Sequence, residues 1–171
     1  MSSENKIRKE KLCMMIKLLA ICLAIIINTT FAQIEPQYHI KSVKTGTFLV
    51  NDSMTADQPL QLGDAVSAVP WTIVPPPGSS SITNSTIYDE ETGLYAGLES
   101  PIVPGAKLTA VIEPYYFLIT NLTSSPDSFI LYPPGQNYYW FANASIGSNV
   151  EVEHAEDIKG GDLFFAFEST S

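Results

Sequence analysis

The chain has 171 residues with nine basic and eighteen acidic side chains, so its formal net charge is −9. Five of the nine basic residues lie before residue 18, and residues 33–171 therefore hold four lysines, no arginine and sixteen acidic residues. The resulting net charge of −12 argues against nucleic acid as a partner, because binding to phosphates requires cationic side chains. The same charge disfavours an anionic membrane surface.

Residues 1–32 have the parts of a secretory signal peptide. A basic region is followed by the uncharged run Leu18–Ile27, and Thr30 and Ala32 supply the small residues that signal peptidase requires. This apolar run is too short to span a bilayer, which takes about 20 residues. We therefore predict a cleaved signal, a mature chain that starts near Gln33, and a secreted, extracellular protein without membrane contact.

Both cysteines, Cys13 and Cys22, fall inside the predicted signal. The mature region therefore has neither a disulfide nor a cysteine nucleophile. A secreted domain of this kind is held together by its hydrophobic core, and a chain of this length buries roughly two-thirds of its unfolded surface. We expect a single monomeric domain over residues 33–171.

Four Asn-x-Ser/Thr triplets follow the signal, and each is an acceptor sequence for N-glycosylation. Four such triplets in a short secreted chain predict a glycoprotein, and they require that the four side chains be exposed. The predicted acceptors are Asn51, Asn84, Asn121 and Asn143.

Short apolar and aromatic runs alternate with clusters of Pro, Gly, Asn, Asp and Ser after residue 33, a pattern typical of an all-β domain. The proline-rich segment 75–80 is predicted to be a loop, because proline lacks the N–H that a sheet interior requires. The segments predicted to be strands are 37–43, 46–50, 71–74, 85–90, 93–98, 107–112, 115–120, 128–132, 138–142, 149–154 and 163–168.

The predicted strands form three similar units. Each unit has an opening strand, a second strand after a turn, and an aromatic closing strand 22 to 24 residues further on. Three such units around an axis can close a small barrel, which predicts a β-trefoil with three pseudo-repeats of about 40–50 residues rather than an ordinary β-sandwich. The side chains expected to fill the shared core are Trp71, Tyr116 and Phe164, with their alternating partners Ile73, Leu118 and Ala166.

The residues do not indicate an enzyme. His39 and His154 are the only histidines, and neither has the spacing of a metal-ligand set. His154 ends a predicted strand whose neighbours alternate between faces, so we interpret it as a surface histidine. The acidic run 89–91 precedes Thr-Gly and is interpreted as a turn. We predict no catalysis, no cofactor and no metal.

Carbohydrate binding is a competing hypothesis. The Gln-x-Trp signature of ricin-type lectins is absent, because neither Trp71 nor Trp140 is preceded by glutamine at the required position. The aromatic side chains of 137–142 are suited to stack on a sugar, but we favour their interpretation as a core or barrel strand.

The segment 155–162, "AEDIKGGD", connects the last two predicted strands. Rigid scaffolds commonly present functional residues on such loops. Lys159 is the only basic residue in the last third of the chain, and a lysine on a protruding loop fits the acidic S1 pocket of a trypsin-like serine protease. The alternative is a solvated turn.

The segments "YHIKSVKTGTFLV", "PWTIV", "YFLI" and "NVEVEH…LFFAFE", in this order, resemble the fungal β-trefoil serine protease inhibitors typified by cnispin. The likeness extends from Tyr38 to Phe167. It implies a β-trefoil without catalysis or cofactor, which inhibits proteases through the final hairpin loop of the third unit. The basic residue at the tip of that loop corresponds to Lys159.

We therefore predict a secreted serine protease inhibitor whose partner is a trypsin-like protease. Lys159 would enter the primary pocket, and Ile158 and Gly160 would flank the reactive bond. Two alternatives remain open: a lectin-like trefoil that binds carbohydrate, and an inhibitor of cysteine proteases that uses a different loop.

Overall fold

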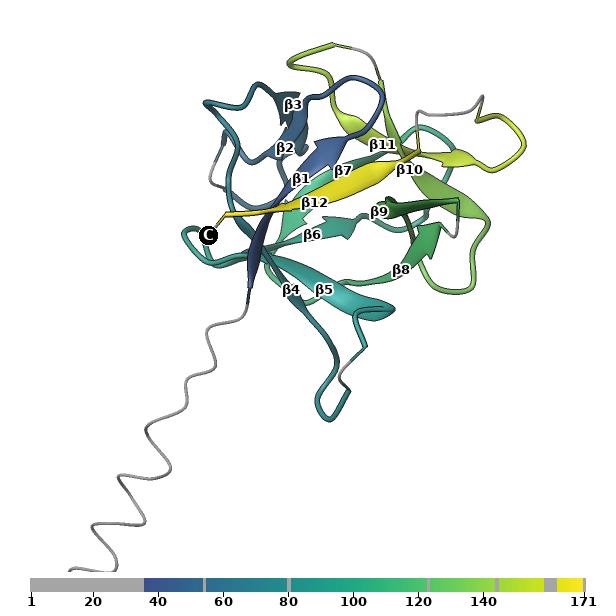
Figure 1. Cartoon of the computed structure of the whole chain (residues 1–171), viewed down its shortest axis with the longest axis horizontal. Helices are drawn as coiled ribbons and strands as arrows, with labels where there is room; N and C mark the ends of the chain where they lie inside the picture. The colour runs from purple at the N-terminus through teal and green to yellow at the C-terminus, as the bar shows by residue number, and fades with distance from the viewer. Residues whose placement is uncertain are drawn as a thin grey trace, which may run out of the picture. The chain divides into compact units, whose positions relative to one another are not determined.

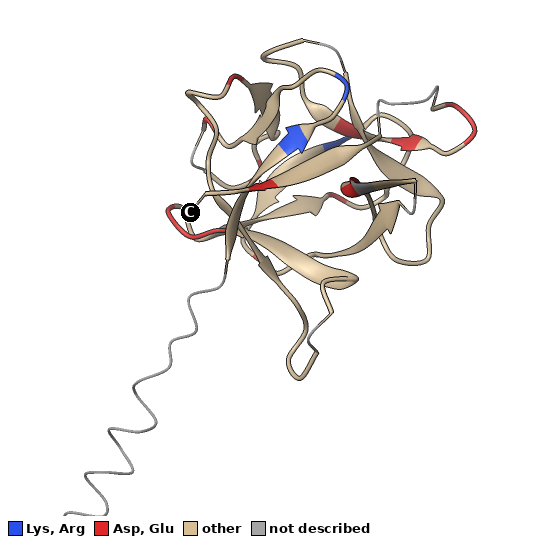
Figure 2. Cartoon of the chain, viewed as in Figure 1, with Lys and Arg blue, Asp and Glu red and all other residues tan. Residues whose placement is uncertain are grey.

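A computed structural model describes residues 36–53, 55–79, 81–122, 124–143, 145–158 and 163–170. The predicted signal, residues 1–32, lies outside these ranges. Acidic residues outnumber lysines within them (Figure 2). No helix long and apolar enough to cross a membrane occurs in the described part of the chain.

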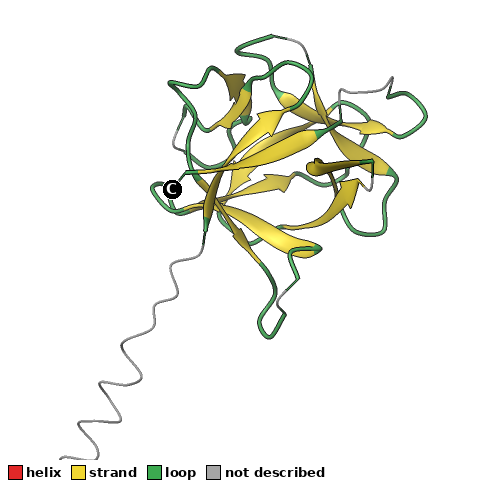
Figure 3. Cartoon of the chain, in the orientation of Figure 1, coloured by secondary structure: helices red, strands yellow, loops and turns green. Residues whose placement is uncertain are grey.

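All regular elements of the described residues are strands (Figures 1 and 3). All eleven predicted strands are confirmed, and the loop predicted at 75–80 contains no described strand residue. A twelfth strand, β3, was not predicted. The strands are β1 (Gln37–Ser42), β2 (Phe48–Val50), β3 (Gln61–Gly63), β4 (Trp71–Val74), β5 (Asn84–Asp89), β6 (Leu94–Leu98), β7 (Ala106–Val111), β8 (Tyr116–Leu122), β9 (Ser125–Tyr132), β10 (Tyr138–Ala142), β11 (Val150–His154) and β12 (Phe165–Ser169).

Six of the strands close into a ring. Antiparallel pairing runs from β1 to β4, β5, β8, β9 and β12, and β12 returns to β1. Closure removes both sheet edges, which would otherwise expose unpaired backbone groups. The first and last strands thus lie side by side over five residue pairs, from Tyr38↔Ser169 to Ser42↔Phe165 (Figure 1).

The remaining six strands form three hairpins, β2–β3, β6–β7 and β10–β11. Each hairpin joins two strands of the ring, so all three lie at the same end of the barrel. They contact one another through the β11–β7 pairing and through the isolated bridges Pro59↔Thr109 and Gln61↔Asn149. Six barrel strands capped by three hairpins confirm the predicted β-trefoil.

Each of the three units contributes equivalent buried residues to the core. On two of the closing strands, however, the buried residues are not the ones predicted. Trp71 and Ile73 are buried as expected. In the second unit Tyr116 is 38% exposed, and the buried residues are Phe117 and Ile119. Successive side chains on a strand point to opposite faces, so this one-residue error exchanges the core and solvent faces of the whole strand.

The closing strand of the third unit shows the same displacement. Phe165 is fully buried, whereas Phe164 and Ala166 are only partly buried. The aromatic residues that occupy equivalent places are therefore Trp71, Phe117 and Phe165, each of which pairs with the opening strand of its own unit.

Trp140 joins the capping hairpins to the barrel. Its side chain is fully buried on β10, and its ring meets Phe117 and Phe165 edge to face, with centroid distances of 4.9 and 5.8 Å. Such geometry is favourable because the positive ring edge faces the negative ring face. This cluster links the second and third units.

The register of β12 can be tested with neighbouring phenylalanines. Phe165→Ala is expected to lower the free energy of unfolding by about 3–5 kcal/mol, since it leaves a cavity beside Trp140. Phe164→Ala is expected to cost about 1 kcal/mol. Chemical denaturation of both variants measures the difference, and a larger loss for Phe164→Ala would contradict the register.

Candidate functional site

The predicted protease-binding loop is described only at its beginning. After β11 a turn forms in which the Asp157 amide donates to the His154 carbonyl at 2.9 Å. Ile158 is partly buried, and Lys159 and Gly160 lie outside the described residues. Figures 1 and 2 show the acidic turn after β11 extending away from the barrel.

The four predicted glycosylation sites differ in exposure. Asn84, Asn121 and Asn143 are exposed, as a glycan requires. Asn51 is only 2% exposed, and its Nδ2 donates to Asp89 Oδ2 at 3.2 Å. A glycan is attached through that nitrogen, so the folded structure does not meet the requirement at Asn51.

Asp89 is a buried carboxylate that organises the contact between the first and second units. It is 2% exposed and accepts hydrogen bonds from the Thr92 hydroxyl at 2.8 Å and from the Glu91 amide at 3.0 Å. These bonds confirm the turn predicted for 89–91. Asn51 adds a donor from the other unit, while its own Oδ1 is buried without a partner in the described structure.

This arrangement predicts a strong effect of Asn51→Asp. The new carboxylate would lie beside Asp89 with no donor for Oδ1, and a buried unpaired charge costs about 3 kcal/mol or more at pH 7. Because a like charge raises the pKa of the introduced carboxyl, the loss should shrink as the pH falls and the carboxyl is protonated.

The matched control is Asn84→Asp, which removes an exposed sequon by the same chemical change. Its effect on stability is expected to stay within about 0.5 kcal/mol. Urea denaturation of both variants at pH 7 and pH 5 makes the comparison. Equal stabilities at pH 7 would contradict the burial of Asn51.

A group of polar and aromatic side chains lies where β10 begins and β11 ends, at the edge of the core-facing side of the third hairpin. Tyr138 on β10 is directly opposite His154 on β11, and their rings meet with centroids 4.9 Å apart at 73°. Asn137 Nδ2 lies 3.5 Å from His154 Nδ1, and Glu156 Oε1 lies 3.8 Å from the same nitrogen. We refer to Asn137, Tyr138, His154 and Glu156 as the third-unit cluster.

Sequence reasoning found only part of this cluster. Within 137–142 the interpretation as a core strand is confirmed for Trp140, which is fully buried. Tyr138 lies on the same face of β10 and packs against the core at its edge, where its ring is partly exposed. His154 does lie at a strand end, as expected. The contact between His154 and Tyr138 depends on the β10–β11 register, for which the sequence offered no signal beyond the two strands themselves.

The cluster is specific to the third unit. Extending the pairing Tyr95↔Val111 by one residue places Leu94 opposite Ile112 in the second unit. The corresponding extension of Phe48↔Gly63 places Thr47 opposite Asp64 in the first. Of the three equivalent positions, only the third combines an aromatic ring with an imidazole.

The chemistry of the cluster suits a ligand that has both apolar and hydroxyl groups. The partly exposed Tyr138 offers part of an apolar ring and a polar hydroxyl group. When His154 Nδ1 accepts from the Asn137 amide, the neutral imidazole carries its proton on Nε2 and presents a donor. Glu156 supplies carboxylate acceptors. No group of three His, Cys, Asp or Glu side chains arranged to hold a metal occurs among the described residues.

A separate polar hollow of about 380 Å³ lies between the first and second units. Asp57, Glu99, Lys107 and Thr109 contribute to its lining. Asp57 has a φ of +63°, a conformation that is uncommon for residues other than glycine. The hollow has hydrogen-bonding groups but no aromatic ring, so it lacks the stacking surface that the third-unit cluster offers.

Comparisons with known proteins agree on the architecture. No protein-family model and no curated protein sequence matches the chain. Among solved structures it is similar to a ricin B-like lectin of Macrolepiota procera in complex with lactose, at 19% identity and a TM-score of 0.65, covering 81% of this chain and 99% of that one.

Two further structures have the same fold. The Rhizoctonia solani agglutinin matches at 13% identity with a TM-score of 0.62, covering 82% of this chain and 99% of that one. The designed three-fold symmetric protein ThreeFoil matches at 13% identity with a TM-score of 0.64, covering 77% of this chain and 97% of that one. At these identities the likeness shows the β-trefoil fold alone.

Proposed function

We propose that the protein binds carbohydrate through the third-unit cluster. The observation that carries this proposal is the partly exposed Tyr138 ring, which core packing holds beside the His154 imidazole and the Asn137 amide. A pyranose has apolar C–H faces that pack on an aromatic ring and hydroxyl groups that exchange hydrogen bonds with planar polar side chains. The trefoil lectin and the agglutinin among the similar structures support the same choice.

The charge around the cluster favours a neutral sugar. Glu151 and Glu153 lie on β11, and Glu156 and Asp157 follow in the adjoining turn. Carboxylates at this density repel an anionic ligand. The proposed ligand is therefore a neutral mono- or disaccharide rather than a sialylated or sulfated glycan.

The proposal is tested by calorimetric titration with lactose and with a panel of neutral and sialylated oligosaccharides. Tyr138→Ala is expected to weaken binding of the neutral ligand by about tenfold, since it removes the stacking surface. Tyr116→Ala is the matched control, because it truncates an exposed tyrosine on β8 outside the cluster.

If Tyr138→Ala binds as tightly as the parent, the site lies elsewhere on the trefoil. If the parent binds no neutral saccharide in the panel, the proposed function itself is overturned.

Protease inhibition is a second candidate, and the observation that favours it is the turn that extends from the barrel after β11. The segment that follows contains Lys159 between Ile158 and Gly160. An extended loop on a rigid trefoil would enter a protease cleft at a reduced cost in ordering.

A panel of trypsin-like and cysteine proteases distinguishes this candidate from the lectin. If Lys159 occupies an S1 pocket, Lys159→Ala should reduce inhibition of trypsin-like enzymes by about a hundredfold or more, because the pocket carboxylate loses its partner. Lys44→Ala is the control for a change in charge. If the Lys159→Ala variant inhibits trypsin-like enzymes as well as the parent does, the loop that contains Lys159 is not the inhibitory site.

A further inference from the structure

A second cavity lies at the opposite end of the barrel from the hairpins. It has a volume of about 420 Å³, within the range of small-molecule sites, roughly 300–1,000 Å³. It is formed where β1 and β9 begin and where β4 and β12 end, and Ile82 from the loop before β5 completes its wall. We refer to it as the barrel-end pocket.

Three aromatic rings line the barrel-end pocket. Phe167 stands between Tyr38 and Phe129, with ring centroids 5.9 Å and 4.7 Å away. The rest of the apolar lining comes from Ile73, Ile82 and Ala166. All three rings are partly buried against the core, so their positions are fixed by packing.

The pocket results from a departure from three-fold symmetry. Tyr38 and Phe129 are paired with the closing strands of the first and third units, opposite Trp71 and Phe165. The equivalent residue of the second unit is Ser85, which is fully buried and donates to the Ile82 carbonyl at 3.0 Å. Aromatic rings therefore gather on one side of the barrel end.

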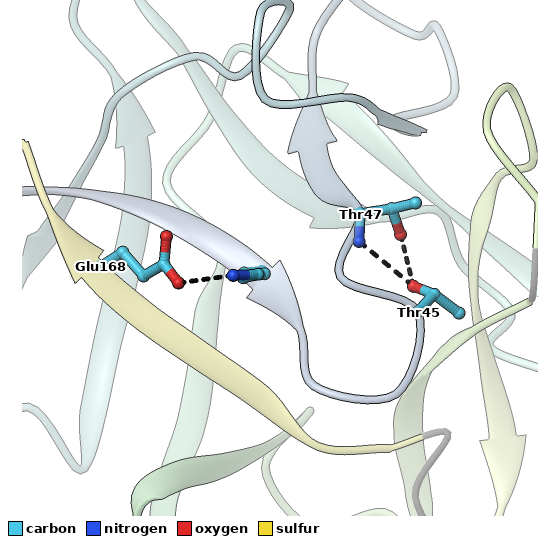
Figure 4. A network of polar contacts seen from close by, with 4 residues as sticks. Thr45, Thr47 and Glu168 are labelled. Atoms are coloured by element: carbon cyan, nitrogen blue, oxygen red, sulfur yellow. Dashed lines mark hydrogen bonds and ion pairs between the residues drawn. The ribbon is translucent and has the colours of Figure 1, made fainter.

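Two carboxylates also line the pocket, and a lysine forms an ion pair with one of them. Glu168 Oε1 forms an ion pair with Lys41 Nζ at 2.8 Å across β12 and β1 (Figure 4). Asp127 is exposed and has no hydrogen-bond or ion-pair partner within the described residues. The pocket thus combines aromatic surface with an uncompensated negative charge.

We propose that the barrel-end pocket binds a small organic ammonium cation that carries an apolar or aromatic group. An ammonium is attracted to the negative faces of aromatic rings and to the carboxylates of Asp127 and Glu168. The apolar part of the ligand would lie against Ile73 and Ile82. A sugar fits this lining poorly, because most of the wall offers no hydrogen bond.

The Lys41–Glu168 ion pair predicts how charge-removing substitutions change the affinity for an ammonium ligand. Lys41 holds Glu168 and lies over the Phe48 ring, 5.3 Å from its centroid. A ligand cation competes with Lys41 for the Glu168 carboxylate. Removing the lysine charge should therefore tighten binding, whereas removing the Asp127 charge should weaken it.

The experiment is calorimetric titration of the protein with 2-phenylethylamine, with the neutral 2-phenylethanol and the anionic 3-phenylpropionate as matched probes. The amine is expected to bind about tenfold more tightly than the alcohol, and the anion is expected not to bind. Asp127→Asn should weaken amine binding by about fivefold and leave alcohol binding unchanged.

Three further variants complete the design. Lys41→Met keeps an unbranched side chain, removes the terminal ammonium group and should strengthen amine binding by several fold. Glu113→Gln removes an exposed acidic charge outside the pocket and should have no effect. Tyr138→Ala should also bind the amine normally, which keeps this test independent of carbohydrate binding.

Equal affinities for the amine and the alcohol would overturn the proposal, as would normal amine binding by Asp127→Asn. A loss of amine binding in Lys41→Met would equally contradict it, provided that circular dichroism shows the variant to be folded.

Discussion

Closure of the six-stranded ring is the constraint on which the other features depend. The pairing of β1 with β12 leaves no free edge in the barrel, and it brings residues from the two ends of the domain into one wall. The barrel-end pocket exists because of this closure, since Tyr38 comes from the first strand and Phe167 from the last. The Lys41–Glu168 ion pair crosses the same seam. Both the stability of the fold and this pocket therefore rest on one strand pair.

The largest core residues occupy equivalent positions in the three units, whereas the candidate sites lie at positions where the units differ. Trp71, Phe117 and Phe165 occupy equivalent buried places because each unit contributes a large aromatic side chain to a shared interior. At the edge of the core and at the open end of the barrel, the side chains of the three units differ. Tyr138 and His154 oppose each other only in the third unit, and the rings of the barrel end belong to the first and third. An equivalent position that differs chemically from its two counterparts is thus the best internal guide to function in this chain.

The sequence predicted the architecture well and the burial of individual side chains less well, for physical reasons. Alternating apolar runs and turn residues located eleven strands, but Gln61–Gly63 has a single apolar side chain and a glycine, so β3 gave little signal. The runs "YYF" and "LFF" each offer adjacent aromatic residues, and periodicity alone does not choose which one faces inward. The burial of Asn51 depends on Asp89, which lies 38 residues away. Local patterns contain no information on a contact of that kind.

The pairing of β1 with β12 also determines when, during synthesis, the barrel can close. Translation proceeds from the N-terminus, and domains generally fold as whole units, so a nascent chain that has completed β1 must wait for more than 120 further residues, up to Ser169, before that strand meets its last partner. Until then the growing chain carries an open, hydrogen-bonding edge beside apolar surface. Such an edge is a template for aberrant association. The barrel therefore has no closed sheet until its final strand is available.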